Sequence, residues 1–251
     1  MGHGAEARTL RQAASGLARR GRRALRRLRP RQPHGGPDPR MLFIVTYGRS
    51  GSTLLQGVLN SIPGYTIRGE NGFAVYHLFR FHQTMVTAQR DKGAAVRALH
   101  PKDAWFGIDE FSPSRSIELI RRIVVDTVIV PPPGTRVAGF KEIRWYRDDL
   151  GEFVEFVRAV FPDARFVINT RDLQATAASK WWKDRPDADD TLAAADALLR
   201  GLLGTLGDSA FHLHYDDYVD HPDGLRPLFA WLGEPFDEAA VREVMAIKHS
   251  Y

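Results

Sequence analysis

The residues best suited to binding an anion lie in a short segment, 47–53, with the sequence Tyr-Gly-Arg-Ser-Gly-Ser-Thr. An apolar run at 41–45 precedes it, and a helix-like run at 54–59 follows it. A buried strand, a glycine- and serine-rich loop and a helix start form a phosphate cradle, because the loop amides and the helix dipole both attract negative charge. The loop carries Arg49 but lacks the Gly-Lys pair that precedes the Ser/Thr of an ATP- or GTP-binding P-loop.

A second candidate anion site follows the apolar run at 165–170. Arg171 comes directly after this predicted strand, and Ser179 lies eight residues further on. In a continuous helix this spacing is slightly more than two turns, so the two side chains would lie on roughly the same side. A guanidinium and a hydroxyl suit a phosphate dianion. The alternative is a surface Arg171 paired with Asp172, with Ser179 in the middle of an ordinary helix.

Three more polar residues come at the ends of predicted strands, namely Glu70, Lys141 and Tyr215. Ligands of open parallel sheets bind outside the carboxyl ends of the strands, so we expect these side chains at the same edge as the loop. Structural roles are the alternatives. Glu70 could pair with Arg68, Lys141 could pair with Glu142, and Tyr215 could pack under the helix that follows it.

From residue 41 onward, strand-like and helix-like segments alternate. The strand-like segments are 41–46, 65–68, 136–140, 165–170 and 211–215. The helix-like segments are 52–60, 74–92, 114–129, 149–161, 172–183, 189–206, 224–232 and 237–247. This order predicts a P-loop-like α/β fold of three layers, in which helices cover both faces of a central parallel sheet. Residues 93–112, with Trp105 and Phe106, read as an irregular loop that we expect to form a lid or a substrate wall.

Composition separates residues 1–40 from the predicted domain at 41–251. The first segment holds eleven arginines and two acidic residues, a net charge of +9, whereas the remainder carries −4. The overall charge of +5 is therefore a property of the tail, and it does not predict that the domain binds nucleic acid. Repeated Pro and Gly predict a flexible tail, and an amphipathic segment resting on anionic lipid is the alternative.

The 251-residue chain has no cysteine, so disulfides, thiol catalysis and cysteine-bound metals are excluded. No run reaches the roughly 18 apolar residues that cross a bilayer, and the N-terminus lacks the apolar core of a secretory signal. We therefore expect a cytoplasmic protein, with peripheral membrane contact through the tail as an alternative. No metal site is expected, because His212 and His214 alternate on one strand in a pattern more typical of packing.

Two groups of aromatic residues have more than one interpretation. Trp181 and Trp182 follow Ser179 directly, and they could pack in the core or form a stacking platform for a sugar or aromatic acceptor. His77 and His82 lie among aromatic residues of a predicted helix, a pattern that is typical of a core face, although either could border a substrate pocket.

The loop at 47–53, the strand followed by Arg171 and Ser179, and the segment 213–222 together resemble the sulfotransferase family. The resemblance spans about residues 41–247, and the loop looks more like bacterial carbohydrate-type members than like cytosolic aryl and steroid enzymes. It implies 3′-phosphoadenosine 5′-phosphosulfate as the donor co-substrate. The residues it implies for the donor are Arg49, Ser50, Gly51, Ser52 and Thr53 at the 5′-phosphosulfate, Arg171 and Ser179 at the 3′-phosphate, and Tyr215 near the adenine.

The resemblance also implies how the reaction would run. Arg49 and the loop amides would stabilise the leaving oxygen electrostatically. Glu70 is the candidate general base for the acceptor hydroxyl or amine. Lys141 would neutralise charge in the transition state or hold Glu70. The acceptor expected from the resemblance is a carbohydrate, a glycoconjugate or a natural product.

Two other functions stay open on the sequence. A P-loop small-molecule kinase or nucleotide hydrolase is disfavoured, because no lysine precedes Ser52 and the strand at 165–170 ends in Arg171 and not in a Mg²⁺-binding aspartate. A nucleotide-binding protein without enzymatic activity is the second alternative.

Overall fold

The structure is a computed structural model that describes residues 38–93 and 100–247, so nearly all of the predicted tail lies outside the described residues. Five parallel strands form one sheet in the order β2-β3-β1-β4-β5. The strands are β1 (Arg40–Val45), β2 (Tyr65–Arg68), β3 (Val137–Glu142), β4 (Arg165–Thr170) and β5 (Ala210–His214). The predicted parallel sheet is confirmed. The first and last strands each start and end one residue earlier than expected, and the third strand starts one residue later and ends two residues later.

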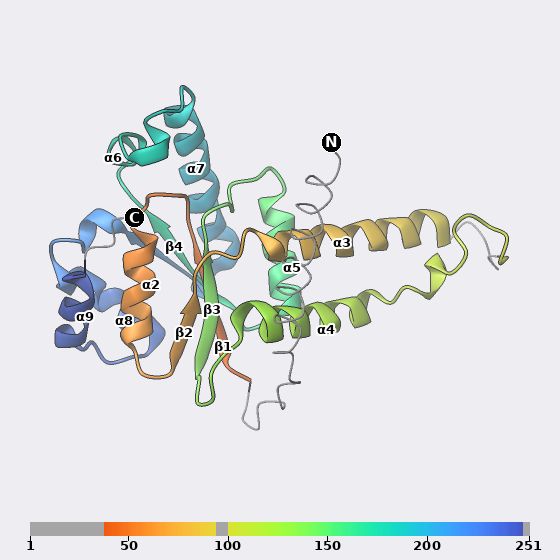
Figure 1. Ribbon diagram of the computed structural model, residues 1–251, viewed down its shortest axis with the longest axis horizontal. Coiled ribbons are helices and arrows are strands. Elements are labelled where there is room, and N and C mark those ends of the chain that lie inside the picture. The colour runs from red at the N-terminus through yellow and green to blue at the C-terminus, as the bar shows by residue number, and fades with distance from the viewer. Residues whose placement is uncertain (1–37, 94–99, 248–251) are drawn as a thin grey trace, which may run out of the picture. The chain divides into compact units, whose positions relative to one another are not determined.

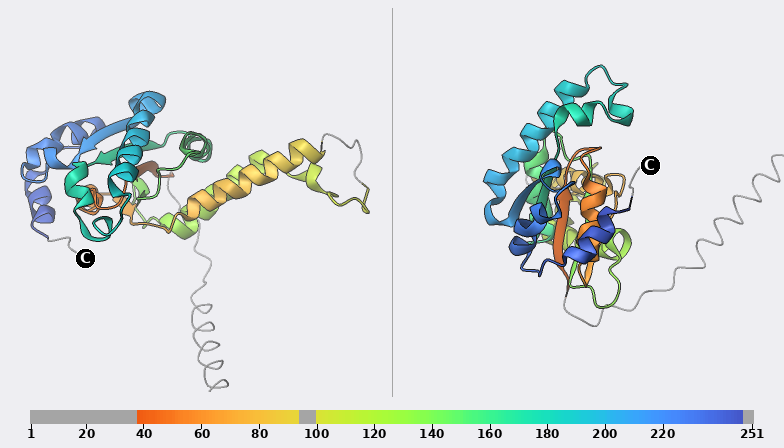
Figure 2. Two further views of the ribbon diagram at one scale, coloured as in Figure 1. Left: turned by 90° about the horizontal axis from the view of Figure 1, so that it is seen from above. Right: turned by 90° about the vertical axis from the view of Figure 1, so that its left-hand side faces the viewer.

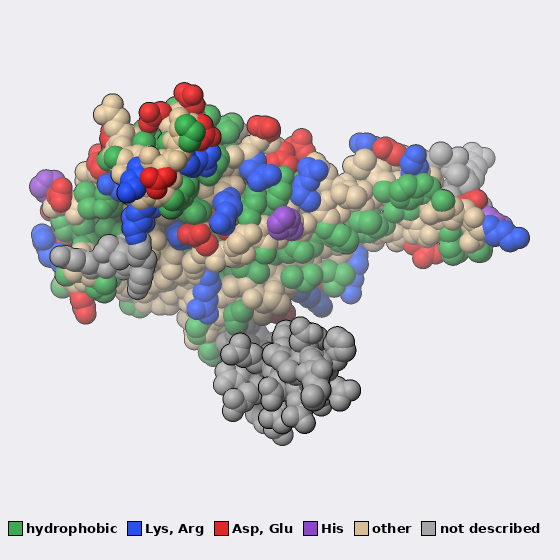
Figure 3. Space-filling model, turned by 45° about the horizontal axis from the view of Figure 1, so that its top comes forward, with side chains coloured by type: hydrophobic (Ala, Val, Ile, Leu, Met, Phe, Trp, Pro, Cys, Tyr) green, Lys and Arg blue, Asp and Glu red, His purple; other side chains and the backbone are tan. Residues whose placement is uncertain are grey.

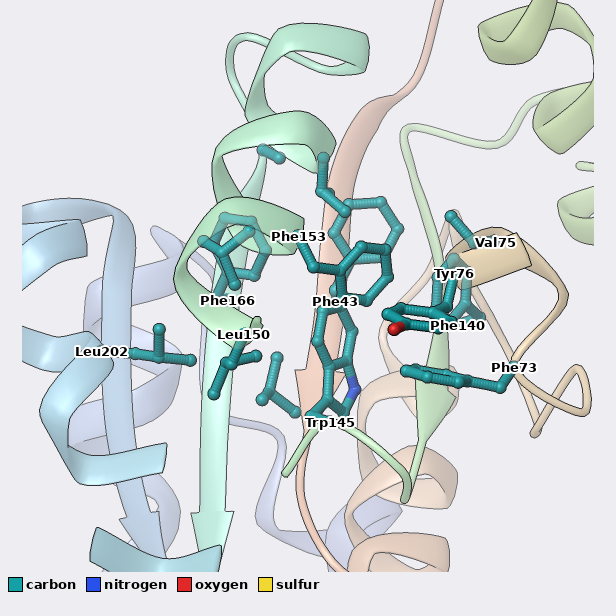
Figure 4. Close-up of a cluster of buried hydrophobic side chains, with 14 of the residues drawn as sticks. Phe43, Phe73, Val75, Tyr76, Phe140, Trp145, Leu150, Phe153, Phe166 and Leu202 are labelled. Carbon is teal, nitrogen blue, oxygen red and sulfur yellow. The ribbon is translucent and has the colours of Figure 1, made fainter. Parts of the chain in front are cut away.

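The central strand β1 shows why the sheet is covered on both faces. Met41 and Phe43 belong to one hydrophobic core, whereas Leu42 and Ile44 belong to a second core on the opposite face. Successive side chains of a strand point to opposite faces, so an uninterrupted apolar run needs cover on both sides. In Figure 4, Phe43 lies among other aromatic rings of the first core, and its ring centroid is 4.8 Å from that of Phe140.

Helices supply that cover, which confirms the predicted three layers (Figure 1). The helices that pack on the first core are α3 (Ala74–Ala88), α4 (Pro113–Ile123), α5 (Leu150–Val160) and α7 (Ala188–Leu206). Those that pack on the second core are α2 (Ser52–Ser61), α8 (Arg226–Leu232) and α9 (Glu238–Met245). The short helix α6 (Leu173–Ala177) follows β4 and belongs to the site region.

The helices α3 and α4 lie side by side and extend away from the sheet as an arm (Figures 1 and 2). A π-helical turn, Gln89–Gly93, extends α3, and a second one, Val124–Ile129, extends α4. Among the described residues between Phe79 and Ser116, none is buried. Apolar side chains therefore show on the surface of the arm in Figure 3. In the segment that joins its two helices, Trp105 is 47% exposed.

The strand order places a ligand-binding crevice at the end of β1. The chain builds β2 and β3 on one side of β1, then crosses to build β4 and β5 on the other side. Where a parallel sheet changes direction in this way, the connections after the strands part and leave a crevice at the carboxyl edge. The loop 47–53 emerges at this point.

In residues 38–93 and 100–247, no helix is long and apolar enough to cross a membrane. This observation concerns the body of the protein alone, because the basic residues 1–37 lie outside the described part.

Close contact between β1 and β3 gives a stability prediction. An added Cβ at Gly139 would lie 1.7 Å from the carbonyl oxygen of Leu42, and neither backbone can move without disturbing the sheet. We expect Gly139→Ala to lower the free energy of unfolding by about 3 kcal/mol or more. Gly151→Ala is the matched control: a Cβ there meets nothing within 4 Å on α5, so a gain of about 0.5–1 kcal/mol is expected. Urea denaturation measures both, and equal effects would contradict the prediction.

Candidate active site

A cavity of about 740 Å³ lies at the carboxyl edge of the sheet. It brings together most of the residues that the sequence predicted for a site. The predicted residues that line it are Arg49, Gly51, Ser52, Thr53, Glu70, Lys141, Arg171 and Tyr215. Ser50 and Ser179 do not line it. The described parts of the 93–112 segment do not line it either.

The start of α2 lies at this cavity and has the features of an anion site. Gly51 precedes the helix with a φ of 78°, and its carbonyl accepts hydrogen bonds from the amides of Leu54 and Leu55. Within the described residues, the amides of Gly51, Ser52 and Thr53 have no hydrogen-bond acceptor. Exposed amides at a helix N-terminus attract an anion. The first turn also contains no acidic residue that would compete for the position.

The shape of the loop is held by a buried hydrogen-bonded cluster, and this is where Ser50 acts. The hydroxyls of Ser50 and Thr46 are 2.6 Å apart, and Thr46 Oγ1 also donates to the carbonyl of Asn169 at 2.7 Å. Asn169 Nδ2 in turn donates to the carbonyl of Ser50 at 2.8 Å. All three residues have no exposed surface. The Ser50 hydroxyl therefore anchors the loop from behind and does not face the cavity.

Arg49 connects the two predicted anion sites. Its Nε donates to Ser179 Oγ at 3.1 Å, and its carbonyl accepts a hydrogen bond from Arg171 Nη1 at 3.1 Å. Arg49 has a φ of 71°, an unusual conformation for a non-glycine residue. Such backbone strain persists only where the surroundings hold it, and it concentrates at binding sites.

Two aromatic residues position Arg171: Tyr47 binds its backbone, and Tyr215 packs against its guanidinium. The Tyr47 hydroxyl accepts from the Arg171 amide at 2.9 Å, and burial raises the pKa of that phenol well above its ordinary value. The Arg171 guanidinium lies 4.7 Å from the centroid of the Tyr215 ring. Its buried Nε has no hydrogen-bond partner among the described residues. An unpaired donor beside the cavity is suited to an anionic ligand.

The predicted continuous helix at 172–183 is wrong. Helix α6 ends at Ala177, Ser179 is extended with φ −97° and ψ 125°, and Lys180 is left-handed with a φ of 44°. The cause is tertiary: Trp182 is fully buried, and its indole nitrogen donates to the Gly48 carbonyl at 2.9 Å. Arg171 and Ser179 therefore share Arg49 as a common neighbour and not one helical face.

Two glycines of the loop are each covered by an aromatic ring. A Cβ on Gly51 would lie 2.0 Å from the Tyr215 ring, and a Cβ on Gly48 would lie 2.5 Å from the Trp181 ring. Any larger residue at either position would displace the ring. Tyr215, directly after β5, thus lies against the loop.

Glu70 and Lys141 form an ion pair of 2.7 Å at the other side of the cavity. The Lys141 side chain is only 6% exposed, whereas that of Glu70 is 37% exposed and accessible to a ligand. The sequence offered Arg68 as a partner for Glu70, and Glu142 or Glu70 as a partner for Lys141. In the structure Glu70 and Lys141 pair with each other. Arg68 donates instead to the carbonyls of Ile129 and Val130.

Glu142 is a site residue whose importance the sequence did not reveal. Its carboxylate is buried and accepts from the amides of Phe73 at 2.9 Å, Ile143 at 2.8 Å and Asn71 at 3.3 Å. These bonds fix the turn that carries Glu70. The Asn71 side chain accepts a hydrogen bond from the amide of Ala74, the first residue of α3. The sequence feature that could have identified Glu142 is a glutamate at the end of a strand that is otherwise mostly apolar.

No histidine of the described residues lines the cavity. His82 bonds Ser116 in the arm, and burial lowers the pKa of its imidazole. His212 and His214 both contact the hydroxyl of Thr170 at 2.9 Å. Among the described residues, no group of three or more histidine or acidic side chains is arranged to hold a metal ion.

Residues 39–238 match the model of the sulfotransferase family, which is more than half of the chain. The chain belongs to the sulfotransferase family. Its fold is similar to the sulfotransferase domain of the Synechococcus PCC 7002 olefin synthase, with a TM-score of 0.51 and 20% identity, covering 87% of this chain and 81% of that one. Sequence comparison with curated proteins found no match.

Two other solved sulfotransferases show weaker likeness. The sulfotransferase domain from the curacin biosynthetic pathway has a TM-score of 0.48 and 15% identity, covering 82% of this chain and 77% of that one. The sulfotransferase STF9 from Mycobacterium avium has a TM-score of 0.46 and 16% identity, covering 83% and 67%. At these identities the comparison of structures concerns the fold alone.

The buried carboxylate of Glu142 gives a prediction for this sulfotransferase. In Glu142→Gln one oxygen becomes an amide donor that faces backbone donors, so we expect the free energy of unfolding to fall by about 1–3 kcal/mol. Because the turn bearing Glu70 loosens, turnover should also fall. Urea denaturation and steady-state kinetics measure the two quantities. The exposed Glu155→Gln is the control, and a Glu142 variant that behaves like it would refute the positioning role.

Proposed function

We propose that this sulfotransferase transfers a sulfuryl group from 3′-phosphoadenosine 5′-phosphosulfate to a hydroxyl, or an amine, of a carbohydrate, glycoconjugate or natural product. The proposal rests on the contacts of Arg49, whose side chain binds Ser179 and whose carbonyl binds Arg171. Through these contacts Arg49 lies between the two candidate anion sites. A donor with phosphates at both its 5′ and 3′ positions requires two such sites close together.

The residues of the cavity suit each part of that donor. The free amides at the start of α2, with the hydroxyls of Ser52 and Thr53 beside them, suit the 5′-phosphosulfate. Arg171, with its unpaired Nε, suits the 3′-phosphate. Tyr215 offers an aromatic surface near both, at the place proposed for the adenine.

The donor supplies an activated sulfuryl group whose leaving group is the nucleotide phosphate. The acceptor oxygen forms a bond to sulfur, the bond between sulfur and the bridging oxygen breaks, and the acceptor proton passes to Glu70. Arg49 and the loop amides stabilise the negative charge that collects on the departing phosphate. Lys141 holds Glu70 toward the cavity through their 2.7 Å ion pair. The products are a sulfate ester and 3′-phosphoadenosine 5′-phosphate.

The first prediction from this proposed function concerns the donor site. Arg171→Ala removes charge-assisted hydrogen bonds, each worth about 1.5–3 kcal/mol, so we expect affinity for 3′-phosphoadenosine 5′-phosphate to fall by at least about tenfold. Isothermal titration calorimetry without Mg²⁺ measures the change. Arg158→Ala, an arginine on α5 paired with Glu155, is the control. Unchanged affinity in the Arg171 variant would remove the 3′-phosphate assignment, and stabilisation of the wild type by ATP with Mg²⁺ alone would favour a kinase.

The second prediction concerns the base. Glu70→Gln keeps the shape of the side chain but cannot take a proton, so kcat should fall by about 10²–10⁴-fold with donor affinity retained. Melting temperature is measured in parallel because Lys141 loses its charged partner. Glu110→Gln, on the exposed part of the arm, serves as the control. Full turnover by the Glu70 variant at saturating acceptor would contradict the role.

A further inference from the structure

The two consecutive tryptophans after Ser179 have opposite surroundings. Trp182 has no exposed surface and donates its indole N–H to the Gly48 carbonyl at 2.9 Å. Trp181 is 43% exposed and lines the cavity. The two rings are stacked, with centroids 4.3 Å apart and an interplanar angle of 28°. One face of Trp181 is therefore covered by its neighbour, and its open face belongs to the cavity.

The backbone directly before the two tryptophans is strained. Lys180 has a φ of 44°, in the left-handed region that a residue with a Cβ rarely adopts. Burial of Trp182 explains why the chain turns inward here, but it gives no reason to hold a second large aromatic ring at an open surface. Conformational strain retained beside a cavity is characteristic of functional sites.

Trp181 lies at the start of the loop, on the side of the cavity that the proposed function assigns to the acceptor. An added Cβ on Gly48 would lie 2.5 Å from the Trp181 ring and 3.5 Å from Ile143 Cδ1. These two side chains thus form a wall at the first residues of the loop, and Ile143 is two residues from Lys141, the partner of Glu70. At the far end of the same loop, Gly51 is covered by Tyr215, which already contacts Arg171.

The surroundings of the open ring are polar. Glu70, Lys141 and Arg144 line the same cavity as Ile143 and Trp181, and the Arg144 side chain is 49% exposed with one nitrogen 3.4 Å from Glu142. A planar phenolic acceptor would favour a pocket closed by several apolar groups. One aromatic face bordered by charged hydrogen-bonding groups suits a sugar ring, which has an apolar C–H face and polar hydroxyls at its rim.

We propose that the exposed face of Trp181 is the acceptor platform of this cavity and binds the C–H face of a pyranose ring, with Arg144 and Glu70 at its hydroxyls. This inference rests on the proposed function and adds the residue that selects its acceptor. One pyranose hydroxyl attacks sulfur, its proton passes to Glu70, and the sulfur–oxygen bond to the nucleotide phosphate breaks. A saccharide sulfate ester and 3′-phosphoadenosine 5′-phosphate result.

The test uses the full chain with labelled donor and two probe sets. The first set contains methyl glycopyranosides and short oligosaccharides of common hexoses and N-acetylhexosamines, and the second contains 2-naphthol and tyrosine methyl ester. We expect label in the saccharides. For the best saccharide, Trp181→Ala should raise KM about tenfold, which corresponds to about 1.4 kcal/mol, with a smaller change in kcat. Trp181→Phe should recover part of this loss, because an aromatic face is restored.

Matched controls separate the possible failures. Trp105→Ala removes a tryptophan of similar exposure (47%) that does not line the cavity, and it should leave KM unchanged. Affinity for 3′-phosphoadenosine 5′-phosphate should be equal in wild type and Trp181→Ala. A loss of that affinity in the variant would assign Trp181 to the nucleotide and overturn the inference. Label in the phenols alone, or no label in any saccharide, would also overturn the inference. The proposed function would still stand in that case, provided that the wild type binds the nucleotide. No binding of the nucleotide to the wild type would reject the proposed function itself.

Discussion

The site depends on the buried hydrogen bonds among Thr46, Ser50 and Asn169. They join the end of β1, the loop and the end of β4, and all three residues are fully buried. The two hydroxyls and the Asn169 side-chain nitrogen all have partners within the cluster, and burying them without partners would be costly, so the cluster allows the loop very few alternative shapes. The loop amides, the backbone of Arg49 and the two glycines that contact aromatic rings all take their positions from this anchor.

The fold was predictable because its determinants are local. Apolar runs bounded by Gly, Pro and polar residues marked all five strands, and the positions of chemical residues after those strands predicted a common edge. The same reasoning failed at 172–183, where spacing alone favoured one helix. The break comes from Trp182, whose burial and hydrogen bond to Gly48 involve a segment 134 residues away. Helix propensity is a weak preference, and a buried tryptophan overrides it.

The sequence predicted which residues lie at the cavity, but it did not predict which of them contact one another. Residue types identified Arg49, Glu70, Lys141 and Arg171, yet the sequence left the partner of each open. Ser50 belongs to the loop motif, but its hydroxyl points away from the cavity because Thr46 offers it a buried partner. Which side chain fills a position at the end of a strand depends on pairings across the sheet, and sequence spacing within one segment contains no information about them.

The last two residues of β3 show how the fold connects Glu70 to the rest of the molecule. Lys141 binds the carboxylate of Glu70, while Glu142 binds the amides just after it, so adjacent residues hold both the side chain and the backbone of one turn. Each buried charge has an opposite charge or several amide donors, which limits the cost of burial. The same turn leads into α3 through Phe73, whose ring stacks on Tyr76 at 4.5 Å in the core. The position of Glu70 is therefore set by the packed root of the arm as well as by β3, although the distal arm contributes no described residue to the cavity.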